Sequence, residues 1–312
     1  MHPSAPLRRV RRIAVAAVGT VALALSLSAC SLVPLVEAIR ALDEASTQRH
    51  PADDVPADDT LDPDEIANPF PPLWADEEFG IVVTYYVNEQ ARLTPEPEAD
   101  SRAAQIWDDF VRVATPEYVG DAVIDFAIGD TDTSDTSASV WMFEDGLWSL
   151  TVNLDQNDDR GDLIATLIHE YAHLLTLDWS QVDIDTPESE CDTLALEEGC
   201  TYRHSTLDRF YEKFWKPYGS SAPADDNADE DVTWEFYQQH EEDFVDEYAA
   251  TNVVEDIAES FMTYVIEPES AQEGPTLASQ KLAFLAGYPE YEEIRDRLRA
   301  EFAEELGRVD QV

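Results

Sequence analysis

Five consecutive residues of this chain, His169-Glu170-Tyr171-Ala172-His173, carry the side chains best suited to bind a metal ion and activate water. Because positions i and i+4 share one face of an α-helix, both imidazoles can point toward a single zinc ion. Glu170 is then placed to take a proton from a water molecule at that metal. The surrounding segment, residues 163–177, is apolar, as expected of a buried helix. The alternative is a pair of core histidines satisfied by hydrogen bonds alone.

A catalytic zinc site needs a third protein ligand and one open position for water. A glycine followed by a third histidine soon after His173 would indicate a metzincin, but Thr176 and Trp179 occupy the corresponding positions. The histidines further downstream, His204 and His240, lie in polar segments, and we interpret them as surface residues. The third ligand is therefore expected to be a carboxylate.

Two carboxylates are candidates: Glu198, in a Glu-Gly step, and Glu255. Helix periodicity favours Glu255, because Glu259 lies within about 40° of it on a stripe that is otherwise apolar. Carboxylates on a buried face need a partner, and a metal ion is one. Asp256 and Ser260 are expected to face solvent. The alternative for Glu255 is a capping box that begins at Asn252.

The N-terminus has the features of an export signal. Four arginines between Arg8 and Arg12 precede an uncharged apolar segment that extends to Leu27. Leu27-Ser28-Ala29-Cys30 resembles the lipobox of bacterial lipoproteins, in which the cysteine is lipidated. This resemblance implies a signal peptide over residues 1–29 and a lipid anchor on Cys30, outside the cytoplasm at the bacterial membrane or cell surface. A transmembrane anchor is the alternative, although the apolar run is short for one.

The charge of the chain is strongly negative, with 67 acidic and 19 basic residues and a formal net charge of −48. Removal of residues 1–29 would delete four arginines and no acidic residue, which changes the charge to −52. Such a charge argues against nucleic acid and against adhesion to anionic lipid, so the membrane is expected to be contacted only through the N-terminal lipid. Residues 30–72 are rich in Asp, Ala and Pro and predict a disordered tether, which leaves residues 73–312 as the folded domain.

Two further cysteines, Cys191 and Cys200, remain once Cys30 is assigned to the lipid. Outside the cytoplasm an even pair is expected to form a disulfide, with free thiols as the alternative. An acidic segment, Asp155-Gln156-Asn157-Asp158-Asp159, begins like a calcium loop. However, it lacks the glycine at loop position 6 and the glutamate at position 12, so a calcium site there is a minor expectation.

The pattern along the chain predicts an α+β fold. We expect a small mixed sheet before the histidine motif and a mainly helical C-terminal lobe, with everything after residue 177 helical or irregular. This order of elements resembles the upper half of a zincin, a resemblance that implies that the strand just before the motif helix lies at the cleft, where a peptide can add on as another strand. The predicted strands are 79–87, 119–128, 138–143 and 147–154, and the predicted helices are 99–114, the motif helix, 205–215, most of 232–266, and 277–306.

The segment 248–261, Tyr-x-x-Thr-Asn-x-x-Glu-x-x-Ala-Glu-Ser-Phe, together with the upstream H-E-x-x-H, resembles the gluzincin catalytic domain of anthrax lethal factor. It is still more similar to a group of bacterial lipoproteins named as zinc-dependent metallopeptidases. The resemblance implies a zincin-like fold and a zinc peptidase. It implies metal ligands His169, His173 and Glu255, with Glu170 as general base. It also implies Tyr248 as hydrogen-bond donor to the transition state and Glu259 as the carboxylate behind a ligand histidine.

The chemistry of these residue types agrees with the implied roles. A phenol keeps its proton at neutral pH and can donate to an oxyanion, and a carboxylate behind an imidazole strengthens that imidazole as a ligand. The alternatives are a packing tyrosine at position 248 and a peripheral salt bridge at Glu259. We therefore expect a zinc-dependent peptidase with peptide or protein substrates. The rival hypotheses are a catalytically inactive zinc-containing lipoprotein that binds peptide or protein ligands, and a cation-scavenging surface protein.

Overall fold

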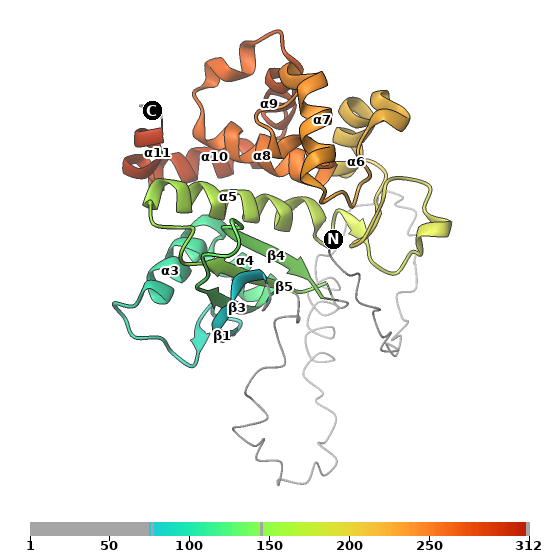
Figure 1. Ribbon diagram of the computed structural model, residues 1–312. Coiled ribbons are helices and arrows are strands. Elements are labelled where there is room, and N and C mark those ends of the chain that lie inside the picture. The colour runs from blue at the N-terminus through green and yellow to red at the C-terminus, as the bar shows by residue number, and fades with distance from the viewer. Residues whose placement is uncertain (1–74, 76–77, 144–145, 310–312) are drawn as a thin grey trace, which may run out of the picture. The chain divides into compact units, whose positions relative to one another are not determined.

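The computed structural model describes residues 75, 78–143 and 146–309. The predicted signal peptide (1–29), the lipidation site Cys30 and the tether (30–72) lie outside the described residues. The described part is a mixed α+β structure, in which a five-stranded sheet is followed by a mostly helical C-terminal region (Figure 1). The predicted α+β class is therefore confirmed. Within these ranges, no helix combines the length and apolar character that a membrane span requires.

The main sheet has the strand order β2-β1-β3-β5-β4. All neighbouring pairs are antiparallel except β3 and β5, which are parallel. β4 is thus an edge strand, paired with β5 on one side. The strands are β1 (Ile81–Val87), β2 (Leu93–Thr94), β3 (Val123–Gly129), β4 (Ala138–Met142) and β5 (Trp148–Asn153).

Two details of the sheet differ from the sequence prediction. The strand that precedes the motif helix, β5, is internal, so the strand at the open edge is β4 instead. The strand predicted from residue 119 begins only at Val123, because Pro116–Ala122 forms helix α4. Pro116 occupies the first turn of α4, and the side chain of Thr115 caps the helix by accepting from the backbone N–H of Tyr118. Both are helix-start signals, and they outweigh the β-propensity of the following residues.

The motif helix α5 (Arg160–Leu177) lies between the sheet and the C-terminal helices (Figure 1). Its N-terminus is capped by Asp159, whose Oδ1 accepts from the backbone N–H groups of Gly161 and Asp162. Arg160 forms a two-pronged ion pair with the buried Asp109 of α3 (Arg102–Ala114). Most residues of α5 are buried, including all five of the motif, so the helix is packed from both sides.

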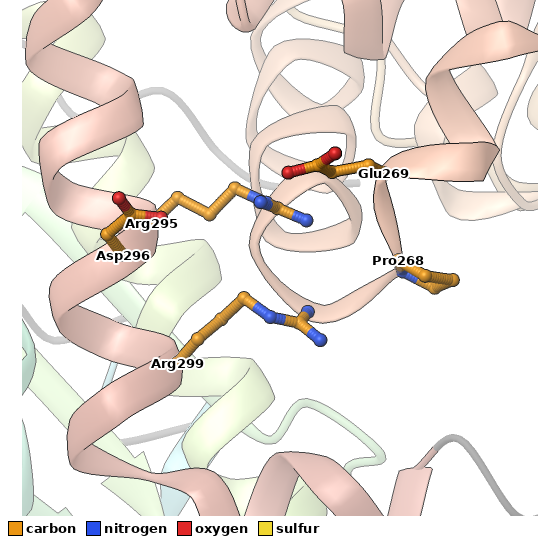
Figure 2. A pocket seen from close by; sticks show the side chains of 5 residues that line it. All are labelled: Pro268, Glu269, Arg295, Asp296 and Arg299. Carbon is orange, nitrogen blue, oxygen red and sulfur yellow. The ribbon is translucent and has the colours of Figure 1, made fainter.

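Helix α8 (Val253–Ile266) packs directly on α5. Asn252 caps its N-terminus, with Oδ1 2.9 Å from the backbone nitrogens of Val254 and Glu255. At the other end, the guanidinium groups of Arg295 and Arg299 from α10 (Pro289–Glu301) donate to the last carbonyls of α8, among them that of Glu267, its C-cap residue (Figure 2). Both termini of this helix are therefore satisfied, by an acceptor at the N-terminus and cations at the C-terminus.

The solvent-facing positions predicted for α8 are wrong. Asp256 and Ser260 are both 0% exposed, because further helices cover that side of α8. Asp256 is ion-paired with Lys281 of α9 (Leu277–Leu285), a residue 25 positions downstream that helix periodicity cannot place. The remaining helices of this region are α6 (Thr206–Phe210), α7 (Glu230–His240) and α11 (Ala303–Val309).

The segment after α5 also contains strands that the sequence analysis did not predict. β6 (Val182–Asp183), β7 (Ala195–Leu196) and β8 (Gly199–Thr201) form a small antiparallel sheet in the order β6-β8-β7. Each strand has two or three residues, which is too short for an alternating pattern to be visible. The predicted disulfide between Cys191 and Cys200 is present beside this sheet.

Candidate metal centre and active site

Three side chains from two helices meet at one point. Nε2 of His169 and Nε2 of His173, both on α5, lie 2.9 Å apart. Oε2 of Glu255, on α8, lies 3.2 Å from the first nitrogen and 3.3 Å from the second. In the part of the chain that the structure describes, these three residues are the metal-ligating group whose donor atoms all lie within 4.8 Å of one another.

This triangle fits a zinc ion. Zinc holds nitrogen and oxygen donors at about 2.0–2.1 Å, which separates tetrahedral donors by roughly 3.3–3.4 Å. The three observed separations are each within about 0.5 Å of that spacing. Oε2 of Glu255 is buried without a hydrogen bond of good geometry, and a buried carboxylate oxygen in this position calls for a cation. Two imidazoles and one carboxylate leave the fourth position of a tetrahedral site open, as in catalytic zinc sites.

Glu259 fixes the orientation of the first histidine. Its Oε1 lies 2.7 Å from Nδ1 of His169, one helical turn beyond Glu255 on α8. With the proton of a neutral His169 held on Nδ1, Nε2 keeps its lone pair and faces the other two donors. Glu255 can act as a metal ligand although it lies in the first turn of α8. Asn252 caps this helix with its own side chain, and the carboxylate of Glu255 extends to the histidines.

The charges of the site depend on one another. Burial alone would lower the pKa of His169, but the carboxylates of Glu255 and Glu259 outweigh it and raise that pKa well above its ordinary value. Burial alone would raise the pKa of Glu255, yet the interactions with His173 and His169 lower it below the usual range of a glutamate. The carboxylates of Glu255 and Glu259 thus stabilise a positive charge at the centre of the triangle.

Glu170 lies on the same helix and is 5% exposed. Burial raises its pKa above the usual value, while the nearby His169 and His173 counteract part of this shift. Its carboxylate also accepts a hydrogen bond from the backbone of Val140 on the edge strand β4. A carboxylate with a raised pKa beside a metal triangle is suited to take up and release a proton.

Tyr248 begins the short 3₁₀ turn η5 (Tyr248–Ala250), which leads into α8. Its ring centroid lies 6.0 Å from that of His169, and its residue surface is 53% exposed. The negative charge of Glu255, followed by burial of the hydroxyl, raises the pKa of Tyr248 well above 10. The phenol therefore remains a hydrogen-bond donor, and half of the residue faces solvent beside the triangle.

Glu198, the rival candidate for third ligand, does not belong to the triangle. It lies in the two-residue turn between β7 and β8, where Leu196 pairs with Gly199. Its carboxylate interacts electrostatically with His173 and Glu255, and burial raises its pKa. It is thus a neighbour of the centre, whereas Glu255 is the carboxylate that contacts both histidines.

The minor expectation of a calcium site near Asp155 finds no geometric counterpart among the described residues. The oxygen Oδ1 of Asp159 is engaged in capping α5. The amide of Asn157 donates to the carbonyls of Ser137 and Asn153, at 2.7 Å in both cases. The amide nitrogen of Asn157 and Oδ1 of Asp159 therefore serve the loop and the start of α5.

The sequence analysis missed Asp246. Burial, followed by the nearby carboxylate of Glu259, raises the pKa of this residue to about 7. Its side chain is hydrogen-bonded to Glu259 and accepts from the backbone N–H of Ala249 at 2.8 Å. His169, Glu259 and Asp246 therefore form a series of contacts behind the metal triangle. Asp246 lies in the acidic segment 241–247, so the sequence pattern does not distinguish it from its acidic neighbours.

Comparisons with known proteins define no family for this chain. No protein-family model matches it, and no curated protein matches it. Among solved structures, a putative zinc-binding metallo-peptidase from Bacteroides caccae aligns over 77% of this chain and 92% of its own, with 16% identity and a TM-score of 0.38. The resemblance to the catalytic domain of anthrax lethal factor gains no support from these comparisons and stays a prediction. The functional argument therefore depends on the geometry of the site.

Proposed function

We propose that this protein is a zinc-dependent peptidase of the gluzincin type. The observation that carries the proposal is the convergence of His169, His173 and Glu255 on one point, with Glu170 and Tyr248 beside it. A structural zinc site would use four protein ligands and would not need a buried base or an exposed phenol next to it. The combination of three ligands, a base and a donor is that of a hydrolytic site.

When bound, zinc would supply a Lewis acid and lower the pKa of a coordinated water to about 7. The protein's own residues would divide the remaining work. Glu170 takes the proton of the attacking water and passes it to the departing amine. Tyr248 donates a hydrogen bond to the oxygen of the peptide carbonyl as negative charge develops there. Glu259 holds His169 in the tautomer that presents Nε2 to the metal.

The substrate that this arrangement supports best is an extended peptide. β4 is an edge strand, and the backbone of its central residue, Val140, contacts the carboxylate of Glu170. A peptide that pairs with the open side of β4 would place its main chain next to the general base. We propose this pairing for β4, in place of the strand β5 that the sequence had suggested.

We also propose that the protein works outside the cytoplasm, attached to the bacterial membrane or cell surface through a lipid on Cys30. The support is the sequence of residues 8–30, with its basic run, apolar segment and lipobox-like end. The disulfide between Cys191 and Cys200 is compatible with an oxidising compartment. The formal charge of −52 after cleavage supports peptide or protein partners over nucleic acid.

The decisive experiment compares the wild-type protein with Glu170→Gln. Zinc per chain is measured by elemental analysis, and cleavage is measured on a mixed peptide library with and without a chelator. We expect one zinc in both proteins and cleavage only by the wild type, reduced by at least about 10³-fold in the variant. Full turnover by Glu170→Gln would refute the mechanism. Zinc binding without any cleavage by the wild type would instead favour a catalytically inactive ligand-binding lipoprotein.

A further inference from the structure

The residue that follows the third ligand is part of a fully buried ion pair. Oδ2 of Asp256 on α8 lies 2.7 Å from Nζ of Lys281 on α9, and both side chains are 0% exposed. Nε1 of Trp215 donates to the same oxygen at 2.6 Å. The ammonium group of Lys281 also lies 3.9 Å from the centre of the Phe244 ring, in a cation–π contact.

Stability alone does not explain this pair. Two charges lose their hydration when they are buried, and apolar side chains of similar volume are often as stabilising or more so. The surroundings of the pair are apolar, with Phe210 and Phe244 beside it, and would accommodate such side chains. What a buried ion pair adds is a constraint on position, because separating the two groups would leave each charge unpaired in an apolar surrounding.

Such a constraint matters here because α8 is buried on almost all sides. Its buried residues extend around the helix, and those opposite the apolar face are the polar Asp256, Glu259 and Ser260, so a rotation would carry these groups away from their partners. A rotation of 20° about the axis would move a side-chain oxygen some 6 Å from that axis by roughly 2 Å. Such a displacement would take Oε2 of Glu255 out of the range in which it contacts both His169 and His173.

Apart from the contact of Glu259 with His169 on the side of α5, the other anchors of α8 act mainly at its ends. Asn252 holds the first turn through backbone N–H groups, and Arg295 and Arg299 hold the last carbonyls (Figure 2). Asp256 lies about 100° around the helix from Glu255 and connects the middle of the helix to α9 and to Trp215. It is therefore placed to resist rotation rather than translation.

We propose that the Asp256–Lys281 ion pair is a positioning device for the metal centre, which fixes the rotation of α8 so that Glu255 meets both histidines. The inference depends on the proposed zinc site and extends it to two residues that do not touch the metal. It predicts that loss of the pair weakens metal binding more than it weakens the fold.

The test is the double variant Asp256→Asn/Lys281→Met. It removes both charges together, keeps an oxygen acceptor for Trp215 and nearly preserves side-chain volume, so that no unpaired charge is left buried. Zinc affinity is measured by competition with a chromophoric chelator, and the unfolding midpoint is measured on the zinc-free proteins. We expect zinc affinity to fall roughly 10–100-fold, as for the loss of other groups that orient metal ligands. We expect the midpoint to change by less than about 5 °C.

Two further variants keep the test decisive. Val119→Ala removes a fully buried side chain from α4, which packs on α3 and β3, and should lower the unfolding midpoint while zinc affinity stays unchanged. Trp215→Phe removes the hydrogen bond to Asp256 together with part of the buried indole, keeps the ion pair, and should weaken zinc binding by a few-fold. The cobalt-substituted double variant should also show a visible spectrum that differs from that of the wild type, because the ligand geometry has changed.

The outcomes separate this inference from the proposed function. If the wild type binds no zinc, the proposed function fails. If the wild type binds zinc and the double variant binds it equally well, the inference is overturned while the proposed function stands. If the double variant does not fold, Trp215→Phe decides, and unchanged zinc affinity there overturns the inference.

Discussion

Nδ1 of His169 lies 2.7 Å from Oε1 of Glu259, and this contact connects the two helices that build the metal centre. The histidine belongs to α5 and the glutamate to α8, one turn beyond Glu255. The second oxygen of Glu259 is buried without a hydrogen bond of good geometry, and the carboxyl group of Asp246 interacts with the Glu259 side chain. The imidazole is thus held from behind by one carboxylate while its other nitrogen faces the triangle.

Glu259→Ala should weaken zinc binding by about 10–100-fold, because His169 loses the acceptor that fixes its tautomer and ring orientation. Glu259→Gln retains a carbonyl oxygen at the same place and should lose less. Both affinities can be measured by competition with a chelator at fixed pH. Equal affinities for Glu259→Ala and the wild type would show that the contact is peripheral.

Glu255→Ala and Glu198→Ala form a matched pair that tests the identity of the third ligand. The first variant removes an oxygen that contacts both histidines, so we expect less than about 0.1 zinc per chain after dialysis. The second removes a neighbour that lies outside the triangle, so we expect about one zinc per chain. The reverse result would assign the ligand to Glu198.

Tyr248→Phe should lower kcat by about 10²-fold, because one hydrogen bond to the developing oxyanion is lost. Zinc content should not change, since the hydroxyl is not part of the ligand triangle. The Michaelis constant should change little if the bond forms only in the transition state. The measurement is steady-state kinetics on a peptide from the library that the wild type cleaves. An unchanged kcat would show that Tyr248 contributes only to packing.

Asp246 should make the stability of the zinc-free protein depend on pH. Its folded-state pKa of about 7 is raised by burial and by Glu259, whereas an unfolded aspartate titrates near 3.9. The protonated form is therefore favoured by folding. Its stabilising contribution is fully present below about pH 4 and is lost as the pH rises to about 7.

Asp246→Asn removes this titration and keeps an acceptor for the N–H of Ala249. Near pH 8 we expect the free energy of unfolding of the zinc-free variant to exceed that of the zinc-free wild type by about 1–2 kcal/mol. This is less than the full pKa shift would give, because Asp246 is partly exposed and interacts with a second carboxylate. The difference should shrink toward pH 5. Urea unfolding at several pH values provides the measurement, and parallel pH profiles for the two proteins would contradict the assignment.

The sequence predicted those features of the site that depend on local spacing. His169 and His173 share a helix face because they are four residues apart, and Glu255 and Glu259 share one for the same reason. The cap at Asn252 was also visible, because its side chain acts within three residues of its own position. Each of these relationships is fixed by helix periodicity and does not require knowledge of the tertiary structure.

Features that depend on distant partners were not predictable in this way. Asp256 was expected to face solvent because nothing near it in the sequence indicated that Lys281 would cover it. The place of β5 inside the sheet follows from the pairing of β3 with β5, which skips over β4 in the chain. The strands β6 to β8 have too few residues for a periodic pattern. In each case long-range contacts override the local preference.

The metal triangle combines side chains that are 82 residues apart, with His173 on one helix and Glu255 on another that is synthesised later. No fragment that ends before α8 contains the complete ligand set. Under the proposed function, a nascent chain therefore carries no hydrolytic centre until α8 has been synthesised and has docked on α5.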